Sequence, residues 1–249
     1  MGFGKKISMN LKLFFKTPLI EFYCDPKFFG VIPEPVPAYK MMPDWFKKIP
    51  TSISARDQMG AKAMTAKKCI PMLDVMSMGF IIPLFADVNI RTNKDGSLIE
   101  AGHNPLDAVI NFHDMQQLGG KTSPSFPGPA IKFINKWVIK TAPGYSTMFI
   151  PPLNVIEPRF TCFSGLVDTD KYPKEVNFPG IWHIKDHDDI LPAGTPLVTC
   201  IPIKRSDMPR SANVRKMTEK EARDIEKIHL KQVSRRNVYT HELREERIK

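Results

Sequence analysis

The chain has 249 residues, a formal net charge of +10 and 23 prolines, about twice the usual share of proline. A hydrophobic content of 42% and a charged content of 25% are ordinary for a soluble globular protein. No apolar stretch reaches the roughly 18 residues that cross a bilayer, and the start lacks the apolar run of a signal peptide, so we expect a soluble, intracellular protein without membrane contact. Because proline is excluded from helix interiors and central strands, the composition favours a mainly β architecture with many loops.

The four cysteines are widely separated and form no C-x-x-C pair. They are Cys24, Cys69, Cys162 and Cys200. This spacing argues against a zinc ribbon and predicts buried, reduced thiols.

The positive charge permits an acidic partner such as nucleic acid. No basic run is interleaved with aromatic residues, which favours lysines spread over exposed faces for solubility. The best basic patch is a short C-terminal cluster, interpreted as a solvated linker rather than a nucleic-acid clamp. Its members are Lys204, Arg205, Arg210, Arg215 and Lys216.

Residues 1–66 are predicted to form an extended N-terminal arm and linker. Residues 31–38 are spaced by prolines, which favours an extended segment laid over another surface. Residues 43–50 predict a short helix that begins at a proline and ends before the next, and residues 51–67 are polar and predict a linker.

Residues 67–205 are predicted to form a β-rich core. Residues 68–73 are the first strand-like stretch, and residues 79–90 follow, interrupted by a proline before an Asp-Gly hairpin turn. Residues 104–119 are ambiguous: an Asn-Pro start and a Gly-Gly stop predict a helix, whereas a strand through residues 108–112 is the alternative.

From residue 132 onward, short apolar runs recur at the 8–12 residue spacing that is typical of a β-sandwich or β-barrel. The predicted strands are 137–141, 148–150, 160–163, 175–178, 181–184 and 197–201.

Residues 206–249 are predicted to form a basic linker and a charged C-terminal helix. Thr218 and Glu221 have the spacing of a capping box, which marks the start of the helix. The apolar positions of this helix form a thin stripe among many charges, which suits docking on a partner or a neighbouring subunit, or else a solvated, partly frayed helix. These positions are Ala222, Ile225, Ile228 and Val233.

Three consecutive features resemble the dUTPase/dCTP-deaminase superfamily, a β-clip group, over residues 137–205. The first is Pro-Gly-Tyr at 143–145, followed by a strand that ends at 151–154; the second is Gly-Leu-Val-Asp-Thr-Asp-Lys-Tyr at 165–172; the third is the run 191–199. The resemblance implies a dUTPase-like β-barrel or sandwich core and, by analogy, a homotrimer.

The same resemblance implies roles for two residues. The aspartate of that family which matches Asp168 activates the attacking water, and the tyrosine that matches Tyr172, offset by one residue, packs on the deoxyribose. A nucleotide site would also involve Asp170, with Arg159 as a cation that binds the phosphates, and a nucleotide hydrolase would use Mg²⁺. Other cations that could bind the phosphates are Lys140 and Lys171.

The phosphate-binding part of the family pattern is missing. The family's Arg-Ser is replaced by Pro152-Leu153-Asn154, and Thr199 stands where the family has a glutamine. The last glycine is Gly194, so no glycine-rich arm follows to bring backbone N–H groups to a triphosphate. We therefore expect no catalytic residues, and interpret Asp168 and Asp170 as turn residues that hydrogen-bond their own backbone.

His183 and His187 are four residues apart beside several aspartates. This spacing binds zinc on a helix, but prolines bracket the segment as strand and turn, and no metal site or other cofactor is predicted.

A second resemblance runs over most of the chain. The similarity is to an uncharacterised family of tailed marine phages and some bacteria, and it covers residues 37–38, 43–47, 137–146, 149–154, 165–172, 176–179, 194–196 and 201–205. It implies a phage-encoded protein that is made in the host cytoplasm and joins the virion. We expect a non-catalytic structural or assembly protein whose arms dock on neighbouring subunits and other virion proteins; the alternative is a nucleotide-binding or nucleotide-hydrolysing enzyme or sensor.

Overall fold

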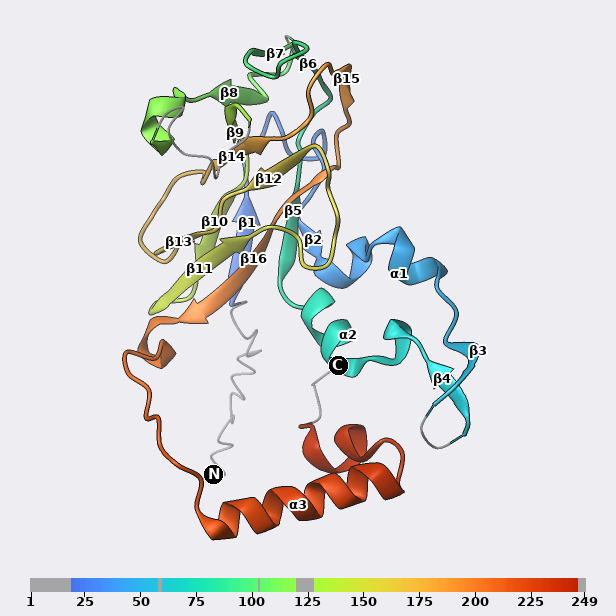
Figure 1. Cartoon of the computed structure of the whole chain (residues 1–249). Helices are drawn as coiled ribbons and strands as arrows, with labels where there is room; N and C mark the ends of the chain where they lie inside the picture. The colour runs from blue at the N-terminus through green and yellow to red at the C-terminus, as the bar shows by residue number, and fades with distance from the viewer. Residues whose placement is uncertain (1–18, 58–59, 103, 120–127, 246–249) are drawn as a thin grey trace, which may run out of the picture. The chain divides into compact units, whose positions relative to one another are not determined.

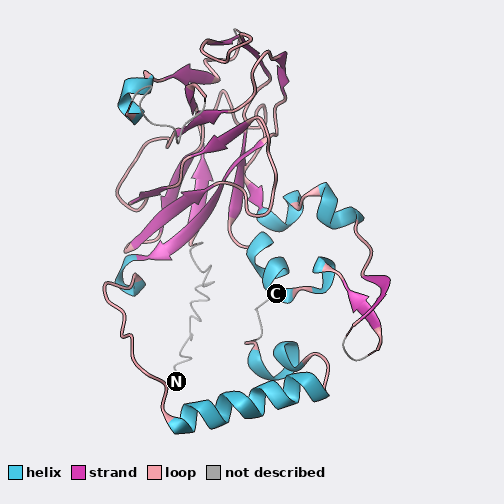
Figure 2. Ribbon diagram, in the orientation of Figure 1, coloured by secondary structure: helices cyan, strands magenta, loops and turns pink. Residues whose placement is uncertain are grey.

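The computed structural model describes residues 19–57, 60–102, 104–119 and 128–245. The chain forms two compact units (Figures 1 and 2). The β unit comprises the described residues up to Pro43 together with Ser77–Ser206, and the helical unit comprises Asp44–Met76 together with the described residues from Asp207 on. The structure is mainly β, with 31% strand and 22% helix, and has the expected C-terminal helix.

The largest sheet of the β unit has five antiparallel strands in the order β13-β11-β16-β5-β2. They are β13 (Gly165–Val167), β11 (Tyr145–Ile150), β16 (Pro196–Lys204), β5 (Phe80–Pro83) and β2 (Val36–Pro37). The outer strands β13 and β2 each pair on one side within this sheet. Through the described part of the chain the strands do not close into a barrel, so the barrel form of the prediction is wrong.

Where the β unit is described, it also contains sheets in the orders β12-β14-β9-β8, β15-β6-β7 and β1-β10. Their strands are β12 (Phe160–Cys162), β14 (Phe178–Trp182), β9 (Ala130–Phe133), β8 (Ile110–Phe112), β15 (Asp188–Leu191), β6 (Val88–Thr92), β7 (Ile99–Ala101), β1 (Ile20–Tyr23) and β10 (Val138–Thr141). Among the described residues, short 3-10 helices lie between strands or after the last one. They are η1 (Ala38–Met41), η3 (Met115–Leu118) and η5 (Arg205–Asp207).

The sheets of the β unit share one hydrophobic core. Strand β6 alternates between buried and exposed positions, as a strand with one face on a core must. Phe133 and Trp182 are fully buried, and the ring of Phe133 lies 4.6 Å from that of Phe160. The indole N–H of Trp182 donates to the carbonyl of Ile184 at 3.0 Å, which satisfies the one polar atom of this side chain.

The described part of the N-terminal arm packs on the core of its own chain. Strand β1 pairs antiparallel with β10, and β2 pairs with β5. Phe28 and Ile32 are 5% and 4% exposed within the core, and the indole N–H of Trp137 donates to the carbonyl of Pro33 at 3.1 Å. The proline-spaced stretch is therefore laid over a surface as expected, and that surface belongs to the same chain.

The helical unit is formed by two segments that are distant in sequence. Its elements are α1 (Asp44–Lys48), β3 (Ser52–Arg56), β4 (Lys62–Met64), η2 (Ala66–Lys68), α2 (Ile70–Met76), α3 (Glu219–Ser234) and the π-helical turn η6 (Tyr239–Leu243). Ion pairs of 2.7 Å join Arg236 to Asp57 and Arg244 to Asp74, and so connect the two segments. No helix among the described residues is both long and apolar enough to cross a membrane.

Several local predictions are confirmed. Helix α1 lies within residues 43–50, and the turn at Gly96, with φ of 76°, connects β6 and β7. The capping box of α3 is present in both directions: the Thr218 hydroxyl accepts from the Glu221 N–H at 3.3 Å, and the Glu221 carboxylate accepts from the Thr218 N–H at 2.8 Å.

Other local predictions are wrong. The helix expected over residues 104–119 does not form: Asn104 closes a short turn by accepting from the Leu106 N–H at 2.9 Å, and the alternative strand is present as β8. Residues 68–73 belong to η2 and α2 rather than to a strand, because Pro71 sits in the first turn of a helix, where no N–H is needed.

Two more differences concern extended segments. The expected linker over residues 51–67 contains the hairpin of β3 and β4. The strand expected over residues 175–178 is reduced to one bridge between Val138 and Glu175, and the pairing moves on to β14. The three-segment domain division stays a prediction.

The close approach of β14 to β12 gives a stability prediction. A Cβ on Gly180 would lie 2.3 Å from the carbonyl oxygen of Thr161, which is backbone and cannot turn away. We expect Gly180→Ala to lower the free energy of unfolding by about 1–3 kcal/mol in urea titrations. Gly165→Ala is the matched control, since a Cβ there meets nothing within 4 Å, and should stay within about 0.5 kcal/mol. Equal stabilities of the two variants would contradict this packing.

Candidate functional site

The candidate site is the acidic turn, defined as residues 168–172, which follows the edge strand β13. Pairing of β13 with β11 places Val167 opposite Thr147 and so fixes where the turn begins. The N–H groups of Lys171 and Tyr172 both donate to the carbonyl of Asp168 at 2.9 Å. The turn is closed as expected, but the carboxylates of Asp168 and Asp170 accept hydrogen bonds from residues outside the turn and, among the described residues, not from their own backbone.

Asp170 is held by Arg205, the residue after β16. Nη1 of Arg205 donates to Oδ1 of Asp170 at 2.9 Å and Nη2 donates to Oδ2 at 2.5 Å, while the Gly144 N–H donates to Oδ2 at 2.8 Å. Only 6% of the Asp170 side chain is exposed. The hydrogen bonds from Arg205, together with the Gly144 N–H, outweigh burial and lower the pKa of Asp170 to about 2.

Asp168 belongs to the same cluster but stays open to solvent. Its Oδ1 accepts from the Ser146 hydroxyl at 2.6 Å and lies 3.4 Å from Nη1 of Arg205. The side chain is 58% exposed. Arg205 also donates to the carbonyl of Tyr145 at 2.9 Å and to the Ser146 hydroxyl at 3.2 Å, so one guanidinium orders both aspartates and the start of β11.

Beneath the turn lies a buried chain of threonine hydroxyls. Oγ1 of Thr169 is 2.8 Å from Oγ1 of Thr141 and 2.7 Å from Oγ1 of Thr147, and Thr141 donates to the carbonyl of Tyr145 at 3.1 Å. The three threonines are 2–4% exposed or fully buried. Such a satisfied network makes the turn rigid. Sequence reasoning missed it, since the three residues sit on three different elements and only pairing brings them together.

The other residues proposed for a nucleotide site are placed less favourably. Arg159 is paired with Glu157 through two hydrogen bonds of 2.7 Å, with side chains 27% and 17% exposed. Among the described residues, no hydrogen bond or ion pair joins Arg159 to the acidic turn. Tyr172 is 44% exposed, and Lys140 and Lys171 are exposed. The structure thus brings Asp168 and Asp170 together with Arg205, which the sequence had placed in a solvated linker.

The two histidines that were considered as metal ligands have separate roles. Nε2 of His183 lies 2.8 Å from the Thr161 hydroxyl, and burial lowers the pKa of His183. The ring of His187 lies 5.2 Å from that of Trp182. Within the described residues, no three His, Cys, Asp or Glu side chains are grouped so that they could hold a metal ion.

The Asp170–Arg205 pair gives a prediction about acid stability. The pKa of Asp170 is lower in the folded chain than its value of about 3.9 in an unfolded chain, so the charged form stabilises the fold above about pH 4 and this stabilisation is lost as the pH falls toward 2. We expect Asp170→Asn to lower the melting temperature at pH 6, and the difference from the parent chain to narrow between pH 4 and about 2.

Asp168→Asn is the matched comparison for this experiment, because it removes a carboxylate from the same turn. Because 58% of the Asp168 side chain is exposed, we expect Asp168→Asn to lower the melting temperature at pH 6 by less than Asp170→Asn does. If Asp170→Asn lowers the melting temperature equally at pH 6 and at pH 2.5, the lowered pKa of Asp170 is contradicted.

In the acidic turn, the buried carboxylate of Asp170 is already paired with the guanidinium of Arg205. What remains accessible for chemistry is the single carboxylate of Asp168, near the exposed Tyr172. No family model matches the chain, and no curated protein matches it either.

Proposed function

We propose that the protein is a non-catalytic structural or assembly protein, built on a dUTPase-like β core, which self-associates through helix α3. The observation that carries this proposal is an apolar groove along α3 that faces solvent. The phage context, the virion as the final location and a homotrimeric core are proposals that rest on the two sequence resemblances alone.

The groove lies between α3 and the chain that leads into it. It has a volume of about 620 Å³. Its apolar residues are Val214, Met217, Ile225 and Ile228, with 94%, 57%, 53% and 37% of their surface exposed. Single exposed apolar residues are common, but a contiguous set in a groove marks an interaction surface. Burying such residues contributes about 25 cal/mol per Å² of apolar surface.

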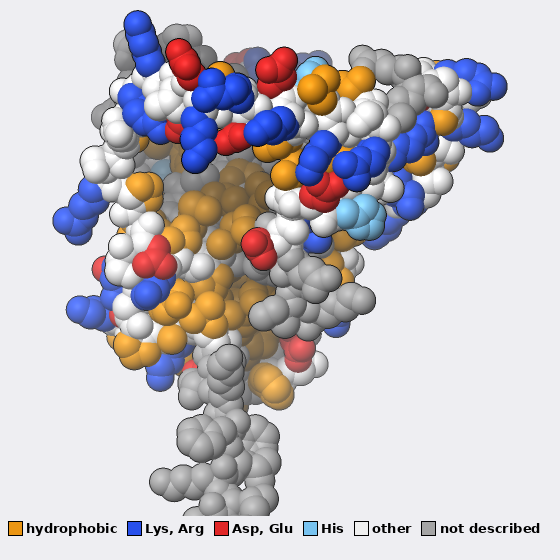
Figure 3. Space-filling model, turned by 90° about the horizontal axis from the view of Figure 1, so that it is seen from below, with side chains coloured by type: hydrophobic (Ala, Val, Ile, Leu, Met, Phe, Trp, Pro, Cys, Tyr) orange, Lys and Arg blue, Asp and Glu red, His pale blue; other side chains and the backbone are white. Residues whose placement is uncertain are grey.

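The charges of α3 are arranged so that a second copy of the helix fits it. Residues 219–226 carry four acidic and two basic side chains, and residues 227–234 carry two lysines and no acidic side chain. Two such helices in antiparallel orientation place each acidic half against a basic half, around a two-fold axis. Figure 3, which looks from below at the helix that is lowest in Figure 1, shows Lys and Arg side chains in a band with acidic and hydrophobic side chains among them.

Of the two extensions, α3 is the one without any buried residue. The described part of the arm is anchored in its own β unit by Phe28 and Ile32, while Phe29 and Val31 are 67% and 60% exposed. A helix that exposes its apolar stripe gains stability by docking, because it cannot bury that stripe alone.

The nucleotide-binding enzyme or sensor remains the second candidate, and one observation favours it. Asp168 is exposed and lies in the same turn as the exposed Tyr172, the two residues that the dUTPase resemblance singles out. The pairing of Arg159 with Glu157 and of Arg205 with Asp170 weighs against it, because a triphosphate would have to compete for those cations.

We expect Ile225→Glu to halve the molar mass of the protein, measured by light scattering after size exclusion at equal concentration. The reason is that the α3 contact joins copies in pairs and cannot bury a carboxylate. Leu230→Glu is the matched control: Leu230 is 60% exposed, does not line the groove, and lies about 140° around the helix from Ile225. A parent chain whose mass is that of one copy, or a loss of mass in both variants, would count against the α3 contact.

For the β core we expect no turnover. The purified chain, incubated with deoxynucleoside and ribonucleoside triphosphates and Mg²⁺, should release no phosphate or pyrophosphate above the blank, since Arg159 and Arg205 are already paired with Glu157 and Asp170 and residues 195–249 contain no glycine. Turnover that disappears in Asp168→Asn would overturn the non-catalytic proposal and establish the second candidate.

A further inference from the structure

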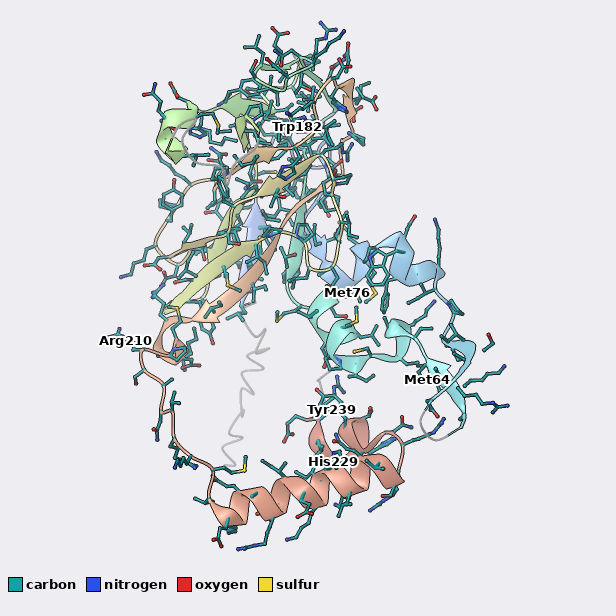
Figure 4. The ribbon with its side chains drawn as sticks, viewed as in Figure 1. Met64, Met76, Trp182, Arg210, His229 and Tyr239 are labelled. Atoms are coloured by element: carbon teal, nitrogen blue, oxygen red, sulfur yellow. The ribbon has the colours of Figure 1, made fainter. Side chains whose placement is uncertain are left out.

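The helical unit contains a second cavity, of about 600 Å³, which is separate from the groove on α3. One wall comes from β4, η2 and the start of α2, and the other comes from the end of α3 and from η6. Met64 of β4 and Tyr239 of η6, both labelled in Figure 4, line it from these two segments. The volume lies within the range of sites that bind small molecules.

The charged residues in the wall leave the cavity with a net charge of +2. They are Lys68, Arg235, Arg236 and Asp57. The pair of Arg236 with Asp57, at 2.7 Å, is neutral, so the excess charge belongs to Lys68 and Arg235. Arg235 lies 3.6 Å from Glu242, a carboxylate that Lys231 already contacts at 2.8 Å. In the described chain we find no acidic side chain within ion-pair distance of Lys68.

The rest of the wall is mixed in a way that suits a ligand with a polar head and a flat body. Ile70, Pro71 and Val238 provide apolar surface, and the ring of Tyr239 is 41% exposed. The polar wall residues Gln232, Asn237 and Thr240 offer amide and hydroxyl groups. Small-molecule sites combine apolar and aromatic walls with a few polar groups in this manner.

We propose that this cavity binds a small phosphate monoester whose phosphate pairs with Lys68 and Arg235 and whose planar ring packs on Tyr239. A phosphate monoester carries about −1.5 to −2 charges at pH 7, which matches the +2 of the wall. The planar guanidinium of Arg235 binds phosphate oxygens in a bidentate manner, and the ammonium of Lys68 adds a point charge. The proposal is independent of the α3 contact, because neither Ile225 nor Ile228 lines this cavity.

The test is calorimetric titration of the full-length protein with adenosine monophosphate, uridine monophosphate and 4-nitrophenyl phosphate. Adenosine, which has the ring without the phosphate, and inorganic phosphate, which lacks the ring, are titrated in parallel. We expect at least one of the three esters to bind more tightly than adenosine and more tightly than inorganic phosphate. Lys68→Ala and Arg235→Ala should each weaken that binding about tenfold, the usual effect of losing a charge-assisted hydrogen bond. Lys62→Ala, which removes an exposed lysine of β4 outside the cavity, should leave it unchanged.

A second readout locates the ligand in the protein. Cys69 lines the cavity and is partly exposed, whereas Cys24 is partly exposed in the β unit. The bound ester should slow alkylation of Cys69 by iodoacetamide and leave the rate at Cys24 unchanged. Absence of binding by all three esters at millimolar concentration, equal binding of inorganic phosphate, or full affinity in both Lys68→Ala and Arg235→Ala would overturn the proposal. Retained affinity in Ile225→Glu would separate this site from the α3 contact.

Discussion

The pairing of β16 on both of its edges is the constraint on which the β unit depends. This strand has nine residues and lies between β11 and β5, the first strand after the helical segment 44–76. Leu197, Val198 and Cys200 are 0–1% exposed in the shared core. Residues 197–201 are all buried, so both faces of β16 are covered, and a slip by one residue would exchange side chains between these two packed faces.

The register of β16 also decides the state of the acidic turn. Arg205 follows the last residue of β16, and the pairing of Lys204 with Tyr145 sets its guanidinium against β11 and the turn. The ion pair with Asp170 is therefore a consequence of sheet register rather than a local motif. Asp170, held in this way, serves to fix the turn.

The sequence predicts well what depends on neighbouring residues. The capping box at Thr218, the short helix α1 and the turn at Gly96 each arise from residues within a few positions of one another, and each is present. Segments with two plausible local structures are decided by pairing: β8 forms because Ile110 and Phe112 pair with β9, which overrides the helix signals of an Asn-Pro start. For residues 68–73 the error is the reverse: a strand is predicted and helices η2 and α2 form, because a short apolar run does not distinguish a strand from a helix.

The candidate site was predictable only in part, for the same reason. Asp168, Asp170 and Tyr172 were singled out because they are adjacent in the chain. Arg205, the partner that determines their state, lies 35 residues beyond Asp170. The dependence on distant partners applies equally to the threonine network, which no spacing in the sequence reveals.

The distribution of charge links these observations to the kind of partner that the protein can bind. By sequence, the segments 44–76 and 207–249 of the helical unit hold 18 Lys and Arg against 11 Asp and Glu, a net +7 of the +10 of the chain. Within the basic cluster at 204–216, Arg205 is paired with Asp170, and Arg215 makes two hydrogen bonds to Glu221, at 2.8 and 2.5 Å. A nucleic-acid backbone needs a row of cations that are free to replace its counterions, and in this cluster at least Arg205 and Arg215 are already engaged. The excess positive charge of the helical unit is therefore better suited to compact anionic partners, such as a small phosphate or the acidic half of a second α3, than to a long polyanion.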